Sequence, residues 1–122
     1  MGFPVVHFEI IGRSGVKLQE FYKKAFGWKI DSNNPIQYGI VKKEKRGIDG
    51  GIAAPEEGQP GHVTVYIEVP NTDTYLKKIE RLGGKTILPT TTIPNMVTFA
   101  LFADPDGNMI GLIKAPRKNK RS

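Results

Sequence analysis

The feature that most constrains this fold is an order of periodicities that occurs twice along the chain. Residues 5–11 alternate like a strand, and residues 15–26 change to the three- and four-residue spacing of an amphipathic helix. Gly27 follows that helix and is a typical stop signal. Three short strand-like runs come next, at residues 28–31, 37–42 and 50–53.

The same order returns after residues 54–61, a linker rich in Pro, Gly and charge. Residues 63–69 have strand composition, and Asn71 or Thr72 is the expected N-cap of a helix that runs through Leu82. Strand-like runs follow at residues 85–91, 97–103 and 109–114. The last two are joined by Asp104-Pro105-Asp106-Gly107, whose order suits a type I turn.

The apolar positions of each half predict which faces are buried. In the two helices, the expected buried side chains are Leu18, Phe21, Tyr22 and Ala25, then Tyr75, Leu76, Ile79 and Leu82. In the strand at 63–69, they are Val63, Val65, Ile67 and Val69.

A half of this size buries too little surface to be stable alone, so two halves are expected to cover each other. The sequence therefore predicts an α+β fold of two βαβββ modules with one helix each, related by a pseudo-twofold axis and forming a cup-shaped, curved mixed sheet. We expect one domain over residues 1–122, with modules at 1–56 and 62–115, the linker at 54–61 and a basic tail at 116–122.

Charge and composition exclude several classes of protein. The net charge is +6, but five Lys and Arg side chains lie in the last nine residues, so no basic face for nucleic acid is indicated. The tail is expected to be poorly ordered and dispensable. The chain has no cysteine and no long apolar run, which excludes disulfides and thiolate metal sites and predicts a cytoplasmic protein without a membrane segment.

Several motifs resemble those of the glyoxalase/bleomycin-resistance/dioxygenase superfamily, also called vicinal oxygen chelate proteins. They are His7 with Phe21-Tyr22 and Phe26-Gly27-Trp28, then Gly83-Gly84, and the segment 102–108 with its Asp-Pro-Asp-Gly-Asn turn. The ending Gly-Asn-x-x-Gly-Leu, residues 107–112, is similar to that of small, largely uncharacterised members. The resemblance covers nearly the whole chain and implies the same paired modules.

In the enzymes of that superfamily, a divalent metal is held by ligands on the first and last strand of each module. The resemblance places these four positions on His7, near Asp49 to Ile52, on Thr64 and on Gly111. Only His7 is a common metal ligand there, although Asp49 or His62 could substitute after a shift of register. We therefore expect no catalytic metal and no other cofactor, and Gly111 is expected to leave space for a ligand.

Two kinds of function follow from this resemblance. The first is a protein that binds a small organic ligand without a metal, through His7, Glu9, Thr64, Tyr66 and Gly111. The second is a divalent-metal-dependent lyase or dioxygenase, similar to lactoylglutathione lyase. His7 and Glu9 are also candidates for metal-free acid–base catalysis, and a homodimer is possible. Trp28 and Tyr38 are open to two interpretations, packing or ligand contact, and His62 is expected at an exposed strand start.

Overall fold

The computed structural model describes residues 2–116. Its contacts divide the chain into two compact units, Val6–Val65 (the first unit) and Met1–Val5 with Tyr66–Ser122 (the second unit). The predicted disorder of the tail falls, from residue 117 on, outside the described residues. Within the described part, neither helix is both long and apolar enough to cross a membrane.

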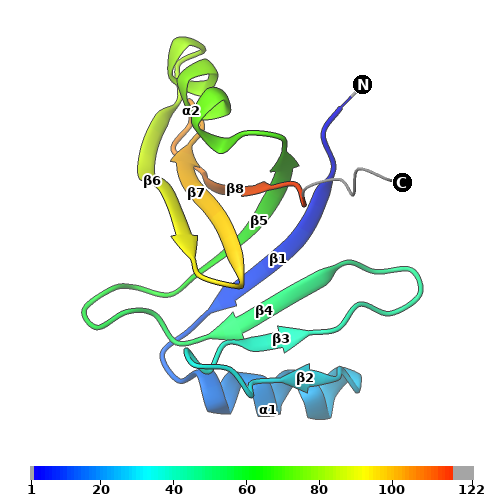
Figure 1. The fold of residues 1–122 in the computed structure, drawn as a ribbon. Coiled ribbons are helices and arrows are strands. Elements are labelled where there is room, and N and C mark those ends of the chain that lie inside the picture. The colour runs from blue at the N-terminus through cyan, green and yellow to red at the C-terminus, as the bar shows by residue number, and fades with distance from the viewer. Residues whose placement is uncertain (1, 117–122) are drawn as a thin grey trace. The chain divides into compact units, whose positions relative to one another are not determined.

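The first unit contains a helix and four strands (Figure 1). Its strand order is β2-β3-β4-β1, with β1 parallel to β4 and the other neighbours antiparallel. The elements are β1 (Val5–Ile11), α1 (Gly15–Phe26), β2 (Ile30–Asp31), β3 (Gly39–Val41) and β4 (Asp49–Ala53).

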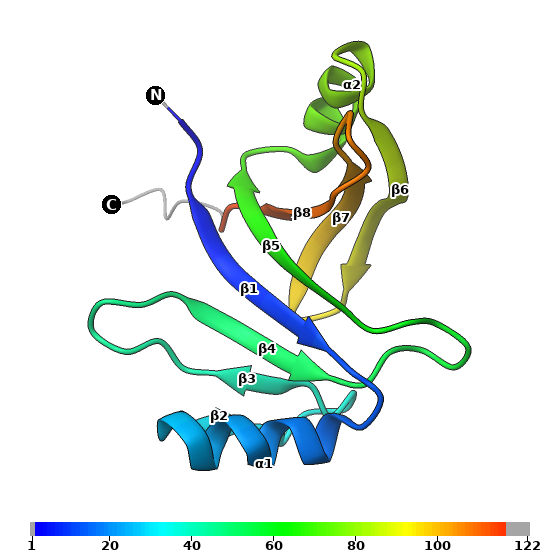
Figure 2. The same ribbon diagram turned by 180° about the vertical axis from the view of Figure 1, so that it is seen from behind.

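The second unit repeats this topology (Figure 2). Its order is β5-β8-β7-β6, again with the first strand parallel to the last and the other pairs antiparallel. The elements are β5 (His62–Val69), which begins in the first unit, α2 (Thr72–Arg81), β6 (Lys85–Ile93), β7 (Val97–Ala103) and β8 (Met109–Lys114). The order βαβββ thus occurs twice in residues 2–116, which confirms the predicted α+β class.

Helix α1 packs with a polar residue at the centre of its buried side. Ser14 caps its N-terminus and Gly27, at φ 72°, ends it. Gln19 is buried, and its Nε2 donates a 2.8 Å hydrogen bond to the carbonyl oxygen of Ile52 in β4. This bond sets the rotation of the helix, so Phe21 and Ala25 face solvent. The prediction that these two side chains are buried was wrong.

Helix α2 covers the core of the second unit. Asn71 is its N-cap and accepts a hydrogen bond from the backbone of Thr74. The helix ends at Arg81, so Leu82 lies outside it and is exposed, contrary to prediction. Val63 is also exposed, because the packing against α2 extends only to the later part of β5. The buried core is Val69, Leu76, Ala100, Phe102 and Leu112, with Ile67, Tyr75, Ile79 and Ile110 packed against it.

The turn between β7 and β8 has the predicted form. The Gly107 amide donates to the Asp104 carbonyl at 2.8 Å, which closes the turn. The Asp104 carboxylate accepts from the amides of Asp106 and Asn108 and from the Asn108 side chain. These bonds lower the pKa of Asp104 below its usual value, with the Asn108 side chain making the largest contribution.

The buried amide of Gln19 gives a direct test of how α1 is fixed to its sheet. Gln19→Ala removes the donor and leaves the Ile52 carbonyl without it, which should lower the free energy of unfolding by about 1–3 kcal/mol. Urea denaturation measures this change. Gln59→Ala, at an exposed linker position, is the control and should change stability little. Equal stability of the two variants would contradict this account of the helix.

Candidate functional site

The polar face of β1 carries a hydrogen-bonded network in the first unit. His7 and Glu9 are two residues apart in the strand and so lie on one face. Tyr38, from the loop before β3, reaches both of them: its hydroxyl lies 2.9 Å from Nε2 of His7 and donates at 3.0 Å to Oε2 of Glu9. The rings of His7 and Tyr38 are nearly parallel, at 17°. The Tyr38 phenol therefore links Glu9 to His7.

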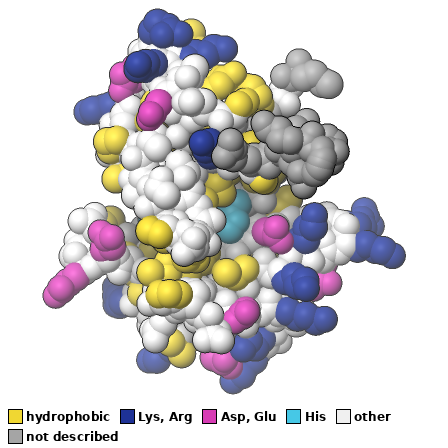
Figure 3. Space-filling view, in the orientation of Figure 1, with side chains coloured by type: hydrophobic (Ala, Val, Ile, Leu, Met, Phe, Trp, Pro, Cys, Tyr) yellow, Lys and Arg dark blue, Asp and Glu magenta, His cyan; other side chains and the backbone are white. Residues whose placement is uncertain are grey.

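His62 adds a second imidazole to this network. Its Nε2 lies 3.3 Å from Oε1 of Glu9, so the two oxygens of one carboxylate face Tyr38 and His62. The His62 side chain is 29% exposed and that of Glu9 is 14% exposed. Figure 3 shows a histidine side chain at the molecular surface. The sequence predicted an exposed His62, and the structure instead places it half-buried against Glu9. We call His7, Tyr38, Glu9 and His62 the polar network.

Two features outside the network hold Tyr38 in place. The side chain of Asn34 accepts from the Tyr38 amide at 3.0 Å and donates to the Tyr38 carbonyl at 2.7 Å. Gln37, just before it, has a positive φ of 54° that turns the chain. The phenol then lies over Gly51 of β4, where an added Cβ would be 1.8 Å from the hydroxyl oxygen. Only a residue without a side chain fits beneath it.

The donor and acceptor of each hydrogen bond at the Tyr38 hydroxyl can be assigned. A carboxylate only accepts, so the single proton of the Tyr38 hydroxyl points to Glu9. The hydroxyl oxygen then accepts from Nε2–H of His7, so Nε2 is a protonated ring nitrogen. Burial lowers the pKa of His7 below the usual 6.5, and the negative charges of Glu9 and Asp49 act against this shift. The lowered pKa of His7 favours its neutral Nε2–H form.

A second tyrosine lies over a glycine in the second unit. Tyr66 of β5 is the register partner of Gly111 in β8, and a Cβ on that glycine would lie 2.3 Å from the Tyr66 ring. The ring also contacts Phe99 edge to face, with centroids 6.3 Å apart. The expected space beside Gly111 is therefore filled by Tyr66, which is buried. The role of Gly111 as a ligand contact stays a prediction.

The residues at the four expected metal positions do not fit a catalytic divalent ion. His7 is hydrogen-bonded to Tyr38, and Asp49, its register partner in β4, accepts from the Lys43 amide. Thr64 offers a buried neutral hydroxyl, and Gly111 offers no side chain. Catalytic zinc sites use three protein ligands. In the described part of the chain, no group of three or more His, Asp or Glu side chains could hold a metal ion.

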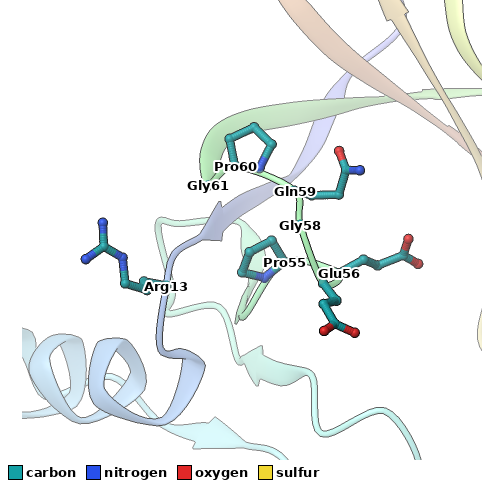
Figure 4. A pocket seen from close by; sticks show the side chains of 8 residues that line it. Arg13, Pro55, Glu56, Gly58, Gln59, Pro60 and Gly61 are labelled. Atoms are coloured by element: carbon teal, nitrogen blue, oxygen red, sulfur yellow. The ribbon is translucent and has the colours of Figure 1, made fainter.

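Other features of the structure are less suited to a site. Trp28 packs against Phe8 and Tyr22, with centroid distances of 5.5 and 5.2 Å, which favours a packing role. A shallow groove along the linker is lined by Arg13 and residues 55–61, and Figure 4 shows Arg13 well apart from Glu56. A second groove lies along the β6–β7 hairpin and the end of β8. Neither groove is lined by a residue of the polar network.

The sequence identified part of this site. Alternation in residues 5–11 placed His7 and Glu9 on one face, and in the structure both side chains are hydrogen-bonded to Tyr38. Tyr38 was expected in a strand-like run at 37–42 and left open between packing and ligand contact, whereas it lies in the loop before β3 and its hydroxyl joins the two side chains. One local signal was available: Asn34-Pro35 is a turn-forming pair, and it begins the loop that carries Tyr38.

The paired βαβββ repeats place the chain in a class of small α+β proteins built from two such modules. The chain belongs to the Glyoxalase/Bleomycin resistance protein/Dioxygenase superfamily, whose family model matches residues 5–112. It is 30% identical over 82 residues to a protein named "Putative glyoxylase CFP32" in Mycobacterium bovis and Mycobacterium tuberculosis. That match covers 66% of this chain but only 31% of the relative.

Solved structures share the fold at low sequence identity. Methylmalonyl-CoA epimerase from Mycobacterium tuberculosis has a TM-score of 0.69 and 12% identity, covering 97% of this chain and 91% of that one. A superfamily member from Vibrio splendidus has a TM-score of 0.60 and 14% identity, with coverages of 93% and 99%. A structure described as an NAD-dependent benzaldehyde dehydrogenase from Legionella pneumophila has 0.68 and 19%, with 90% and 98%. These likenesses show the fold alone.

The lowered pKa of His7 predicts how stability changes with pH. Between the folded pKa and the usual 6.5, the unfolded chain binds more protons at His7 than the folded one. The contribution of neutral His7 should be fully present above pH 6.5 and be lost as the pH falls toward the folded pKa. Melting temperatures from pH 8 to 5 measure it. His7→Gln, which cannot titrate, should show a flatter profile, and identical profiles would contradict the prediction.

The contact between Tyr38 and Gly51 predicts a coupling between two positions. Gly51→Ala should displace the phenol and lower the free energy of unfolding by about 1–3 kcal/mol. Most of that cost should disappear in a Tyr38→Ala background, because the added methyl group then has space. Gly47→Ala is the control, since its Cβ would meet nothing closer than 3.8 Å. Chemical denaturation of the double-mutant cycle measures the coupling, and strict additivity would rule it out.

Proposed function

We propose that the chain binds a small organic molecule at the polar network, without a catalytic metal. The observation that carries this proposal is the arrangement of two imidazoles, a phenol and a carboxylate, contributed by β1, the loop before β3 and the start of β5, and joined by hydrogen bonds of 2.9, 3.0 and 3.3 Å. Ligand sites typically place a few polar groups of this kind to fix the orientation of a ligand. The partial exposure of His62 and Glu9 supports access to the network.

The same geometry argues against the metal-dependent lyase or dioxygenase. Tyr38 already bonds Nε2 of His7 and one oxygen of Glu9, so the hydroxyl occupies the position between two groups that could otherwise be ligands. At Gly51 a carboxylate or imidazole side chain would collide with the same phenol. Metal chemistry would therefore require Tyr38 to move away. The names of the relatives describe enzymes, but this chain spans about a third of the curated proteins that it matches.

The residues of the proposed site differ in the observations that support them. His7 and Glu9 are predicted contacts that the structure joins to Tyr38 and His62. Thr64, Tyr66 and Gly111 stay predictions as ligand contacts. Of these, Thr64 and Tyr66 are buried at 3% and 6% exposure, and the Tyr66 ring covers Gly111. The homodimer also stays a prediction.

Two measurements on one preparation test the proposal. Protein purified without a His tag and dialysed against a chelator should hold far less than one divalent metal per chain by elemental analysis. It should also show melting-temperature shifts with members of a library of small organic compounds. For such a compound, Tyr38→Phe or Glu9→Gln should weaken binding about tenfold in calorimetry, as expected for one lost hydrogen bond.

One variant serves as the control, and one metal-binding result would contradict the proposal. Glu57→Gln removes an exposed linker carboxylate and should leave binding unchanged. The proposal is wrong if the dialysed protein keeps about one metal per chain and loses it in His7→Ala, because that pattern requires His7 as a metal ligand.

A further inference from the structure

The two histidines of the polar network have different partners. Nε2 of His7 bonds to a phenol, and burial lowers the pKa of this side chain. Nε2 of His62 bonds instead to the carboxylate of Glu9. Since a carboxylate accepts, Nε2 of His62 carries the proton of the neutral ring, and Nδ1 is the nitrogen with the lone pair. Nδ1 is therefore the atom through which His62 would take up a proton.

The position of Glu9 is fixed from its other side. Tyr38 donates to Oε2 of Glu9, while Oε1 faces His62, so the carboxylate cannot turn away without losing a bond. Asn34 in turn holds the backbone of Tyr38 through two hydrogen bonds. A carboxylate held in this way orients an imidazole and stabilises its protonated form, which is what a general base requires.

We propose that His62 and Glu9 form a proton-transfer dyad that acts on water or on a hydroxyl group of a bound organic molecule. This inference rests on the proposed function, because it assigns chemistry to the same metal-free site. His62 is the proton acceptor, at 29% side-chain exposure, and Glu9 is its positioning residue. His7 and Tyr38 hold the far side of the carboxylate.

The proton transfer involves only His62, Glu9 and the O–H group. Nδ1 of His62 takes the proton of an O–H group, the N–H bond forms, and the electron pair of the broken O–H bond stays on the oxygen. When that oxygen belongs to water, it forms a C–O bond with the carbonyl carbon of an ester, and the π electron pair of the carbonyl moves to its oxygen. When the carbonyl re-forms, the bond to the leaving alcohol breaks, and the alcohol takes the electron pair of that bond and a proton. The imidazolium formed is paired with the Glu9 carboxylate 3.3 Å away, and it later returns its proton to solvent or to the product.

Hydrolysis of p-nitrophenyl acetate tests the dyad with a defined probe. The second-order rate constant is measured at pH 7 in the presence of a chelator, with circular dichroism to check the fold of each variant. His62→Ala should lower the protein-dependent rate at least tenfold, and Glu9→Gln about tenfold, within the range expected for a general base. Gln59→Ala and Glu57→Gln, at exposed linker positions, should react like the unmodified chain.

A double variant separates positioning from a general structural effect. Glu9→Gln should cause no further loss in a His62→Ala background, because Glu9 acts through His62. Additive losses, or a rate that His62→Ala leaves unchanged, would overturn the dyad while leaving metal-free ligand binding in place. A rate that the chelator abolishes and added Zn²⁺ restores would instead overturn the proposed function together with the dyad.

Discussion

The hydroxyl group of Tyr38 joins the parts of the candidate site. It accepts a hydrogen bond from His7 and donates one to Glu9, and so leaves the second carboxylate oxygen for His62. The position of this one oxygen depends on the main chain around it: Asn34 fixes the backbone of Tyr38, and Gly51 leaves the volume that the ring needs. If the Asn34 hydrogen bonds or the space at Gly51 were lost, the two imidazoles and the carboxylate would remain near one another but would lack a common orientation.

The second unit uses the same kind of contact for a different purpose. Tyr66 also lies over a glycine, Gly111, but its ring is buried and packs on Phe99. In the first unit the phenol belongs to a hydrogen-bonded network that is partly open, whereas in the second unit the ring is buried against Phe99. The two βαβββ repeats therefore share a topology and a tyrosine that lies over a glycine, but the surroundings of the two tyrosines differ.

Local patterns predicted most of the fold. Periodicity placed α1 at Gly15–Phe26, and strand composition placed β7 and β8, because these elements are decided by neighbouring residues. Burial was predicted less well: the hydrogen bond of Gln19 to β4 turns Phe21 outward, and a polar residue at the centre of a helix face leaves no apolar signal. His7 and Glu9 could be paired by alternation, but His62 meets Glu9 from 53 positions away, which no local pattern encodes.

The close fit of Tyr38 over Gly51 restricts the order in which this site can change during evolution. Any side chain at position 51 meets the phenol, so a metal ligand there is disfavoured for as long as the tyrosine remains. Loss of the tyrosine first would break the bonds to His7 and Glu9 before a replacement exists. The two positions are therefore epistatic, and each protects the other from single substitutions.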